Sequence, residues 1–94
     1  MDREVARQLL VKAIAEIQEQ SGRNVGTLDD NVHPFKDVEG FDSLNGEEVT
    51  TMLLEDLLFD EDINPFLSEN DEELTIGEIS DRLAAVATEK EKVS

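Results

Sequence analysis

Apolar residues recur at steps of three and four in three parts of the chain. Before residue 20 they are Val5, Leu9, Leu10, Ala13, Ile14 and Ile17. In residues 43–59 they are Val49, Met52, Leu53 and Leu57, and after residue 75 they are Ile76, Ile79, Leu83 and Val86. This spacing gathers apolar side chains on one face of an α-helix. The pattern therefore predicts three long amphipathic helices, over residues 2–20, over residues 43–59 and after residue 75.

Residues that cap or break helices mark the ends of these segments. Asp2 suits the N-cap of the first helix, and Gly22 suits the left-handed position that ends it. Thr75 and Glu78 have the spacing of a capping box at the start of the last helix. Ser43 stands where the middle helix begins, and an N-cap is the most common role for a serine at such a position.

Two irregular stretches join the predicted helices. Residues 22–42 contain several glycines and a proline, so we expect a long loop whose apolar residues turn inward. Residues 60–73 are acidic, and Pro65 suits the first position of a short helix within them. No strand-like alternation is present. The sequence predicts an all-α fold, a small four-helix bundle of three long helices and one short helix with a long first loop. It should form one domain over residues 1–88, followed by a flexible C-terminal tail at 89–94.

Composition narrows the class of protein. The 94 residues contain no cysteine, which excludes a disulfide scaffold and a thiolate metal site. The charged N-terminal residues run directly into an amphipathic pattern, and the apolar runs are far too short to cross a membrane. We therefore expect a cytoplasmic protein without a signal peptide.

The net charge of −16 is concentrated in one part of the chain. Residues 37–81 contain 16 acidic residues and no Lys or Arg, whereas the rest of the chain has 8 acidic and 8 basic residues, which cancel. The negative electrostatic field around such a segment repels nucleic acid and anionic lipid and attracts basic protein surfaces. A solvated acidic face that only keeps the protein soluble is the alternative explanation.

Ser43 is the hydroxyl presented where the long loop ends and the middle helix begins. Gly40 and Gly46 are at the wrong offsets for the Gly-x-Ser-x-Gly elbow of hydrolases. The only histidine, His33, precedes a proline in the loop, and nothing marks it as a base for Ser43. Because a catalytic serine needs a base within hydrogen-bonding reach, the hydroxyl is better explained as a substrate for another enzyme.

The residues Gly40-Phe41-Asp42-Ser43-Leu44 resemble the Gly-x-Asp-Ser-Leu motif of acyl and peptidyl carrier proteins. The resemblance extends over roughly residues 3–88. It includes the order of the elements: a first helix, a long loop, a helix that opens at the serine, a short third element and a closing helix. Phe35 matches a phenylalanine in the loop of that family, and Leu74-Thr75-Ile76 is similar to the segment that opens its last helix.

The resemblance implies an acyl carrier protein, which is not itself an enzyme. Ser43 would receive a 4′-phosphopantetheine arm from coenzyme A through a phosphopantetheinyl transferase (holo-ACP synthase). Asp42 would take part in recognition by that transferase, and Leu44 completes the motif. The arm would carry acyl or aminoacyl groups as thioesters. It would deliver them to enzymes of fatty acid, polyketide or related biosynthesis.

The resemblance also implies where partners bind. Family partners contact the acidic outward face of the helix that opens at the serine. By position this face comprises Leu44, Glu47, Glu48, Met52 and Glu55. The implied partners are the transferase and biosynthetic enzymes with basic surfaces, and neither nucleic acid nor membrane is expected to bind. The carrier is expected to be a monomer.

Two departures from the family pattern favour a specialised carrier over the housekeeping one. Asn45-Gly46 replaces residues that favour a helix more strongly, and residues 60–73 form a longer acidic stretch.

Two other functions stay open. One is an unmodified acidic interaction protein on the same fold, in which Ser43 is only a helix cap. The other is a divalent-cation-binding protein using residues 60–71. Its Asp60-x-Asp62-x-Asn64 opens like a calcium loop, but Pro65 stands where glycine is required, so no metal ligand is assigned.

Overall fold

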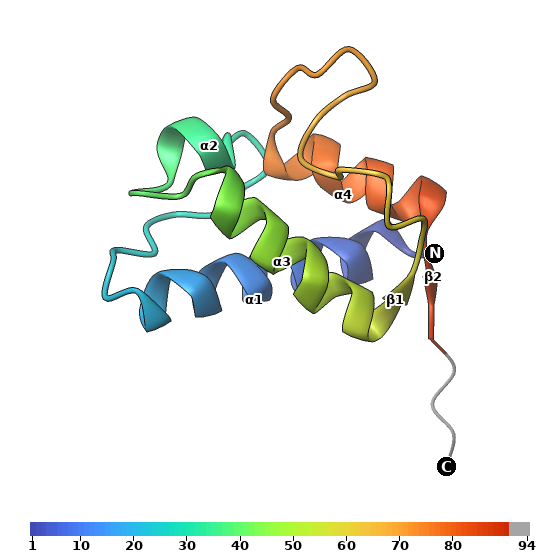
Figure 1. Cartoon of the computed structure of the whole chain (residues 1–94), viewed down its shortest axis with the longest axis horizontal. Helices are drawn as coiled ribbons and strands as arrows, with labels where there is room; N and C mark the ends of the chain where they lie inside the picture. Colours follow the sequence, from blue (N-terminus) through green and yellow to red (C-terminus); the bar gives the residue numbers. More distant parts are fainter. Residues whose placement is uncertain (91–94) are drawn as a thin grey trace.

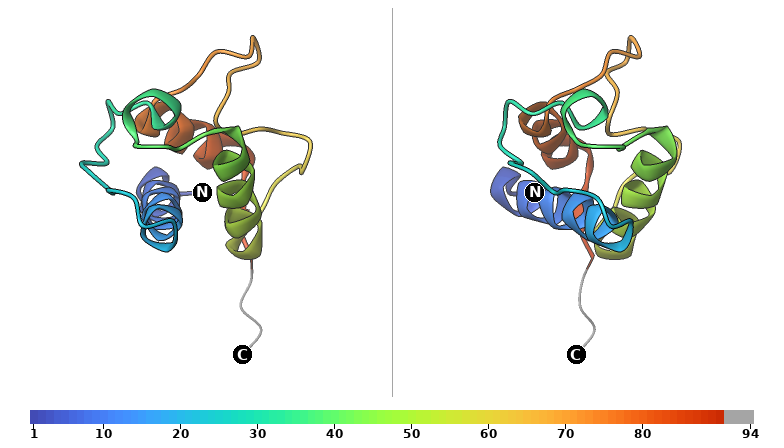
Figure 2. Two further views of the ribbon diagram at one scale, coloured as in Figure 1. Left: turned by 60° about the vertical axis from the view of Figure 1, so that its left-hand side comes forward. Right: turned by 90° about the vertical axis from the view of Figure 1, so that its left-hand side faces the viewer.

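Helix α1 (Arg3–Gln20) is the element against which the other long helices pack. In the computed structural model, which describes residues 1–90, α1 contacts both α3 (Ser43–Asp56) and α4 (Ile76–Val86) (Figure 1). The two further views in Figure 2 show these three helices around a common interior. The three long helices predicted from periodicity are therefore confirmed, and the chain forms a small, mostly helical domain.

The capping residues predicted for α1 and α4 occupy the expected positions. Asp2 is the N-cap of α1 and accepts a hydrogen bond from the Glu4 N–H at 2.8 Å. Thr75 is the N-cap of α4, and it exchanges hydrogen bonds with Glu78 in both directions. These bonds satisfy N–H groups that have no partner within the helix, so each helix start is fixed by its own sequence.

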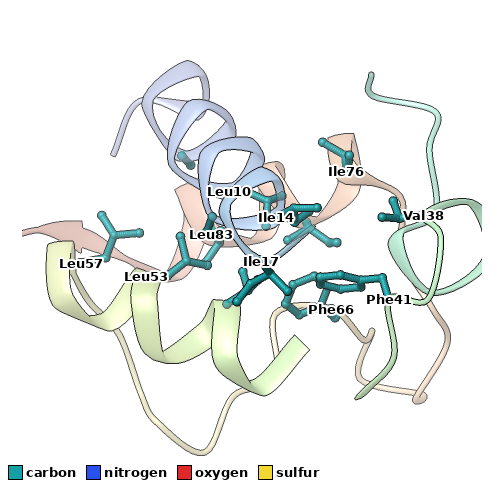
Figure 3. Close-up of a cluster of buried hydrophobic side chains, with 14 of the residues drawn as sticks. Leu10, Ile14, Ile17, Val38, Phe41, Leu53, Leu57, Phe66, Ile76 and Leu83 are labelled. Atoms are coloured by element: carbon teal, nitrogen blue, oxygen red, sulfur yellow. The ribbon is translucent and has the colours of Figure 1, made fainter. Parts of the chain in front are cut away.

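The core is formed by the apolar stripes of the three long helices (Figure 3). Its fully buried members include Leu10, Ile14, Val49, Ile76, Ile79 and Leu83. Phe41 and Phe66, from two different loops, close one end of this core, and Leu53 and Leu57 lie toward the other. Val86, expected on the inward stripe, is 39% exposed, and the neighbouring Ala87 is buried in its place. The remainder of the predicted stripes is buried or half-buried, as expected.

Two short strands correct the predicted end of the middle helix and the start of the tail. The helix expected over residues 43–59 ends at Asp56, because β1 (Leu57–Leu58) pairs antiparallel with β2 (Thr88–Glu89). The extended backbone turns Leu57 into the core and leaves Leu58 exposed. Glu89, expected to begin a flexible tail, is therefore held in a strand, and residues 91–94 of that tail lie outside the described part of the chain.

The short helix lies in a different place from the one predicted. It is α2 (Pro34–Asp37), within the first loop, whereas Pro65 begins a turn. The side chain of Asn64 accepts a hydrogen bond from the Phe66 N–H at 3.0 Å, so local turn formation competes with a helix there. Phe66 is fully buried, so it anchors residues 60–73 although no helix forms.

The first loop is attached to α1 and α4 around Asp30. Its carboxylate accepts hydrogen bonds from Arg7 Nε at 2.7 Å and from Arg3 Nη2 at 3.0 Å, and its carbonyl accepts the Gly77 N–H at 3.0 Å. The hydrogen bond from Arg7, followed by that from Arg3, lowers the pKa of Asp30.

Within residues 1–90, no helix has the length and apolar character needed to span a membrane.

Candidate functional site

Ser43 is the first residue of α3, and its side chain is exposed. The N-cap of α3 is Asp42, whose Oδ1 accepts the Asn45 N–H at 3.1 Å. Asn45 Oδ1 accepts the Asp42 N–H at 3.3 Å, which completes a capping box. The interpretation of Ser43 as the N-cap is therefore wrong, because Asp42 fills that position one residue earlier. The Ser43 hydroxyl makes no hydrogen bond within the part of the chain that the structure describes.

Gly40 gives the loop its final turn before α3. Its φ is +65°, a left-handed backbone conformation that favours glycine. A Cβ atom at this position would also lie 2.7 Å from Cδ of Arg23, which crosses directly over it. Phe41 follows, and its ring is buried in the core. The first two residues of the motif thus have structural roles that bring Asp42 and Ser43 to the surface.

Three phenylalanine rings form a cluster beside the start of α3. Phe35 lies 5.3 Å from Phe66 and 5.8 Å from Phe41, and Phe41 lies 5.8 Å from Phe66, measured between ring centroids. Gly46 is buried against this cluster, and a Cβ atom there would lie 2.9 Å from Cζ of Phe35. The residues Asn45 and Gly46, which favour a helix weakly, therefore have local explanations: Asn45 completes the cap, and Gly46 makes room for the Phe35 ring.

A hollow of about 360 Å³ opens next to Ser43. Its apolar wall comes from Phe35, Phe41 and Leu67, and its polar wall from Asp42, Ser43, Asn64, Asp71 and Glu73. Residues 60–73 thus return to the start of α3, although they are distant from it in sequence. Ser43 therefore lies at a hollow lined by aromatic side chains and carboxylates.

The outward face of α3 matches most of the predicted partner surface. Glu47, Glu48 and Glu55 are exposed, and Leu44 is 66% exposed. Met52 differs, because it is half-buried against the core and lines a small hollow between α1 and α3. Four of the five predicted contact residues therefore form an exposed acidic face that begins beside Ser43, and Met52 lies at its edge.

His33 is directed to a different part of the loop. Its backbone N–H donates to Asp37 Oδ2 at 2.9 Å, and its Nδ1 lies 3.8 Å from the same carboxylate oxygen. No hydrogen bond joins it to Ser43 among residues 1–90. His33 is therefore not placed to act as a general base for the Ser43 hydroxyl.

The residues of the candidate calcium loop are used in turns. Asp60 Oδ1 accepts the Asp62 N–H at 2.9 Å, and Ser68 Oγ accepts the N–H groups of Asn70 and Glu72. In residues 1–90, no three His, Asp or Glu side chains gather in a way that would hold a metal ion. The structure thus gives no support to the divalent-cation-binding alternative.

Arg23 is the residue of this region that the sequence did not point to. It follows the end of α1, yet its guanidinium reaches both Gly40 and Asn45. Nothing in the local sequence pattern links a residue after the first helix to the start of the third, so only the folded chain reveals this contact.

Together these features define a class: a small helical domain that displays an exposed serine hydroxyl, without a hydrogen-bond partner among residues 1–90, at a helix start beside an aromatic cluster and an acidic helix face. No protein-family model, curated protein sequence or solved structure matches this chain.

Proposed function

We propose that the protein is a carrier of the acyl carrier type, in which Ser43 bears a 4′-phosphopantetheine arm. The observation that supports this most strongly is the free hydroxyl of Ser43, exposed at the first position of α3 while Asp42 provides the cap. A serine that served only to cap the helix would stand at the N-cap and accept a backbone N–H. The resemblance of residues 40–44 to the carrier motif supplies the identity of the arm.

Attachment of the arm needs no catalytic group from this chain. Ser43 Oγ attacks the phosphorus atom that joins the pantetheine end of coenzyme A to the rest of the molecule. The bond between the two linked phosphates breaks, adenosine 3′,5′-bisphosphate leaves, and the hydroxyl proton passes to a base of the transferase. The product is a phosphodiester, and the free thiol at the end of the arm then takes a cargo as a thioester.

The surroundings of Ser43 act on the phosphodiester in two opposite directions. The N-terminus of α3 favours a negative charge by about 0.3–1 kcal/mol. The carboxylates of Asp42, Asp71 and Glu73, which line the hollow beside Ser43, oppose it. We therefore expect a mobile arm. A mobile tether suits a carrier, because it raises the effective concentration of the cargo at each partner's active site.

The acidic face of α3 would guide partners to the arm. Glu47, Glu48 and Glu55 are exposed on it, and residues 37–81 contain no Lys or Arg to offset their charge. A basic surface on the transferase would therefore be attracted. The association rate should fall as the ionic strength rises to about 0.15 M, where the Debye length has shortened to about 8 Å. Glu47→Gln together with Glu48→Gln should raise KM for the carrier and flatten this salt dependence.

Intact-mass measurement tests the proposal. The full chain is incubated with coenzyme A, Mg²⁺ and a broad-specificity phosphopantetheinyl transferase. We expect a gain equal to the mass of one 4′-phosphopantetheine group. The gain should disappear in Ser43→Ala and persist in Thr27→Ala, which removes another exposed hydroxyl, in the first loop. An unchanged mass for the natural chain, or a gain that survives in Ser43→Ala, would refute the carrier function.

An unmodified interaction protein is the second candidate, and the exposed acidic face of α3 is the observation that favours it. Both functions predict binding to basic surfaces, so only modification of Ser43 separates them. A chain that is never modified, yet binds a basic partner in a salt-dependent way, would support this second function.

A further inference from the structure

Arg23 links three segments at the start of α3. Its Nη1 donates to the carbonyl of Gly40, and its Nη2 donates to Asn45 Oδ1 at 3.1 Å and to Ser21 Oγ at 3.3 Å. Gly40 lies in the loop just before Ser43, Asn45 lies in the first turn of α3, and Ser21 lies at the end of α1. We propose that Arg23 is a positioning residue that holds the Ser43 hydroxyl in its exposed orientation. The catalytic part of this inference rests on the proposed function.

The contact with Asn45 connects Arg23 to the helix cap. Asn45 Oδ1 accepts from Arg23 and also from the Asp42 N–H, at 3.1 and 3.3 Å. The Asn45 N–H returns a hydrogen bond to Asp42 Oδ1 at 3.1 Å. Arg23 therefore fixes the side chain whose oxygen closes the capping box, and Ser43 lies between the two residues of that box.

Ser43 depends on such indirect support because its own hydroxyl has no partner among residues 1–90. Its position is set only by the backbone from Gly40 to Gly46. Arg23 holds this backbone from the side of α1, and the Phe35 ring packs against it from the side of the aromatic cluster. A transferase that must bring Oγ in line with a phosphorus atom is sensitive to this placement.

Arginine suits this position better than lysine does. The planar guanidinium presents several N–H groups in a fixed fork and can donate to Gly40 and Asn45 at once. The side chain also lies flat over Gly40, where Cδ would be 2.7 Å from an added Cβ. A lysine ammonium retains the charge, but it is a compact point donor without this fork.

Variants at Arg23 separate charge from positioning. Arg23→Lys keeps the charge and Arg23→Gln removes it, and both lose the fork. The matched control is Arg7→Gln, which breaks comparable hydrogen bonds to Asp30 and to the Leu28 carbonyl in a different part of the fold. Steady-state transfer of the arm from coenzyme A is measured well below the unfolding temperature of each variant, with the carrier as the varied substrate.

We expect kcat to fall roughly ten- to a hundredfold in both Arg23 variants and to stay unchanged in Arg7→Gln. KM for the carrier should change little in Arg23→Lys. If Arg23 only stabilises the fold, the kcat of all three folded variants will match that of the natural chain, and that result would overturn the inference.

Amide hydrogen exchange tests the positioning in the unmodified protein, whatever happens to the arm. The Asn45 N–H, which donates to Asp42 Oδ1, should exchange roughly five- to tenfold faster in Arg23→Gln, as expected when one hydrogen bond is lost. Its exchange rate should not change in Arg7→Gln. Equal Asn45 rates in both variants would refute the positioning role, whereas a natural chain that shows no transfer would refute only the proposed function.

Discussion

Replacement of Gly46 by alanine places two physical effects in opposition. Gly46 lies in the first turn of α3, where alanine favours the helix by up to about 1 kcal/mol. The same residue is buried against the aromatic cluster, where a new Cβ would lie 2.9 Å from Cζ and 3.1 Å from Cε1 of Phe35. Helix propensity alone predicts a more stable protein, and packing predicts a less stable one.

Packing should be the larger effect. The Phe35 ring would have to shift, but its neighbours Phe41 and Phe66 stand with ring centroids 5.8 and 5.3 Å away. Forcing an extra methyl group into such a site costs about 1–3 kcal/mol. After the gain in propensity is subtracted, Gly46→Ala should lower the free energy of unfolding by about 1 kcal/mol. For a domain of this size the unfolding temperature should then fall by roughly 4–8 °C.

Urea unfolding followed by circular dichroism measures this change, and a second background identifies its cause. When Phe35→Leu removes the ring, Gly46→Ala should become neutral or stabilising, so the two substitutions should not be additive. Thr51→Ala, at an exposed position of the same helix, reports propensity without the contact. If Gly46→Ala stabilises the natural chain, the proposed steric conflict with Phe35 is refuted.

Three further predictions concern the caps and the attachment of the loop. Asp42→Ala should lower the free energy of unfolding by about 1 kcal/mol, and Thr75→Ala by a similar amount, because each removes an N-cap; chemical denaturation measures both. The lowered pKa of Asp30 means that its contribution to stability is complete above the ordinary aspartate value of about 4. This contribution should be lost as pH falls through the lower folded value, and Asp30→Asn should flatten that part of the stability profile. If stability falls at acid pH in Asp30→Asn as it does in the natural chain, the loss of stability does not come from the hydrogen bonds of Asp30 with Arg7 and Arg3.

The features predicted correctly from the sequence are those that local residues determine. Periodic apolar positions fixed the three long helices, and the capping box of Thr75 and Glu78 fixed the start of α4, because each depends on residues within one or two turns. The exposure of Glu47 and Glu48 follows from the same periodicity. Ser43 is exposed where the loop ends and the helix begins, as the local pattern predicts.

Two of the features that sequence analysis misses depend on residues that are distant in sequence. Leu57 leaves the helical pattern because Glu89 pairs with it, and no local signal announces a partner so far along the chain. Local sequence marks Gly46 only as a weak helix former, because the Phe35 ring that requires a glycine there comes from the preceding loop. The position of the cap was ambiguous for another reason. Asp42 and Ser43 are both good N-cap residues, and only the folded backbone shows which one is used.

This assignment of the cap leads to a prediction about the motif itself. Gly40 supplies a left-handed turn, Phe41 fills the core, and Asp42 caps α3, so folding accounts for all three. Ser43 and Leu44 are different, since the hydroxyl has no partner among the described residues and the leucine is 66% exposed. Ser43→Ala and Leu44→Ala should each change the free energy of unfolding by no more than about 0.5 kcal/mol.

Under the proposed function, the same two substitutions should have large effects on transfer of the arm. Ser43→Ala should abolish it, and Leu44→Ala should raise KM for the carrier, because contact with a partner would bury the apolar surface of this exposed leucine beside the reacting serine. Unfolding curves and transfer kinetics on the same preparations test this separation of folding from function. If either variant loses several kcal/mol of stability, that residue has a structural role that its exposure does not reveal, and its exposure no longer supports the carrier function.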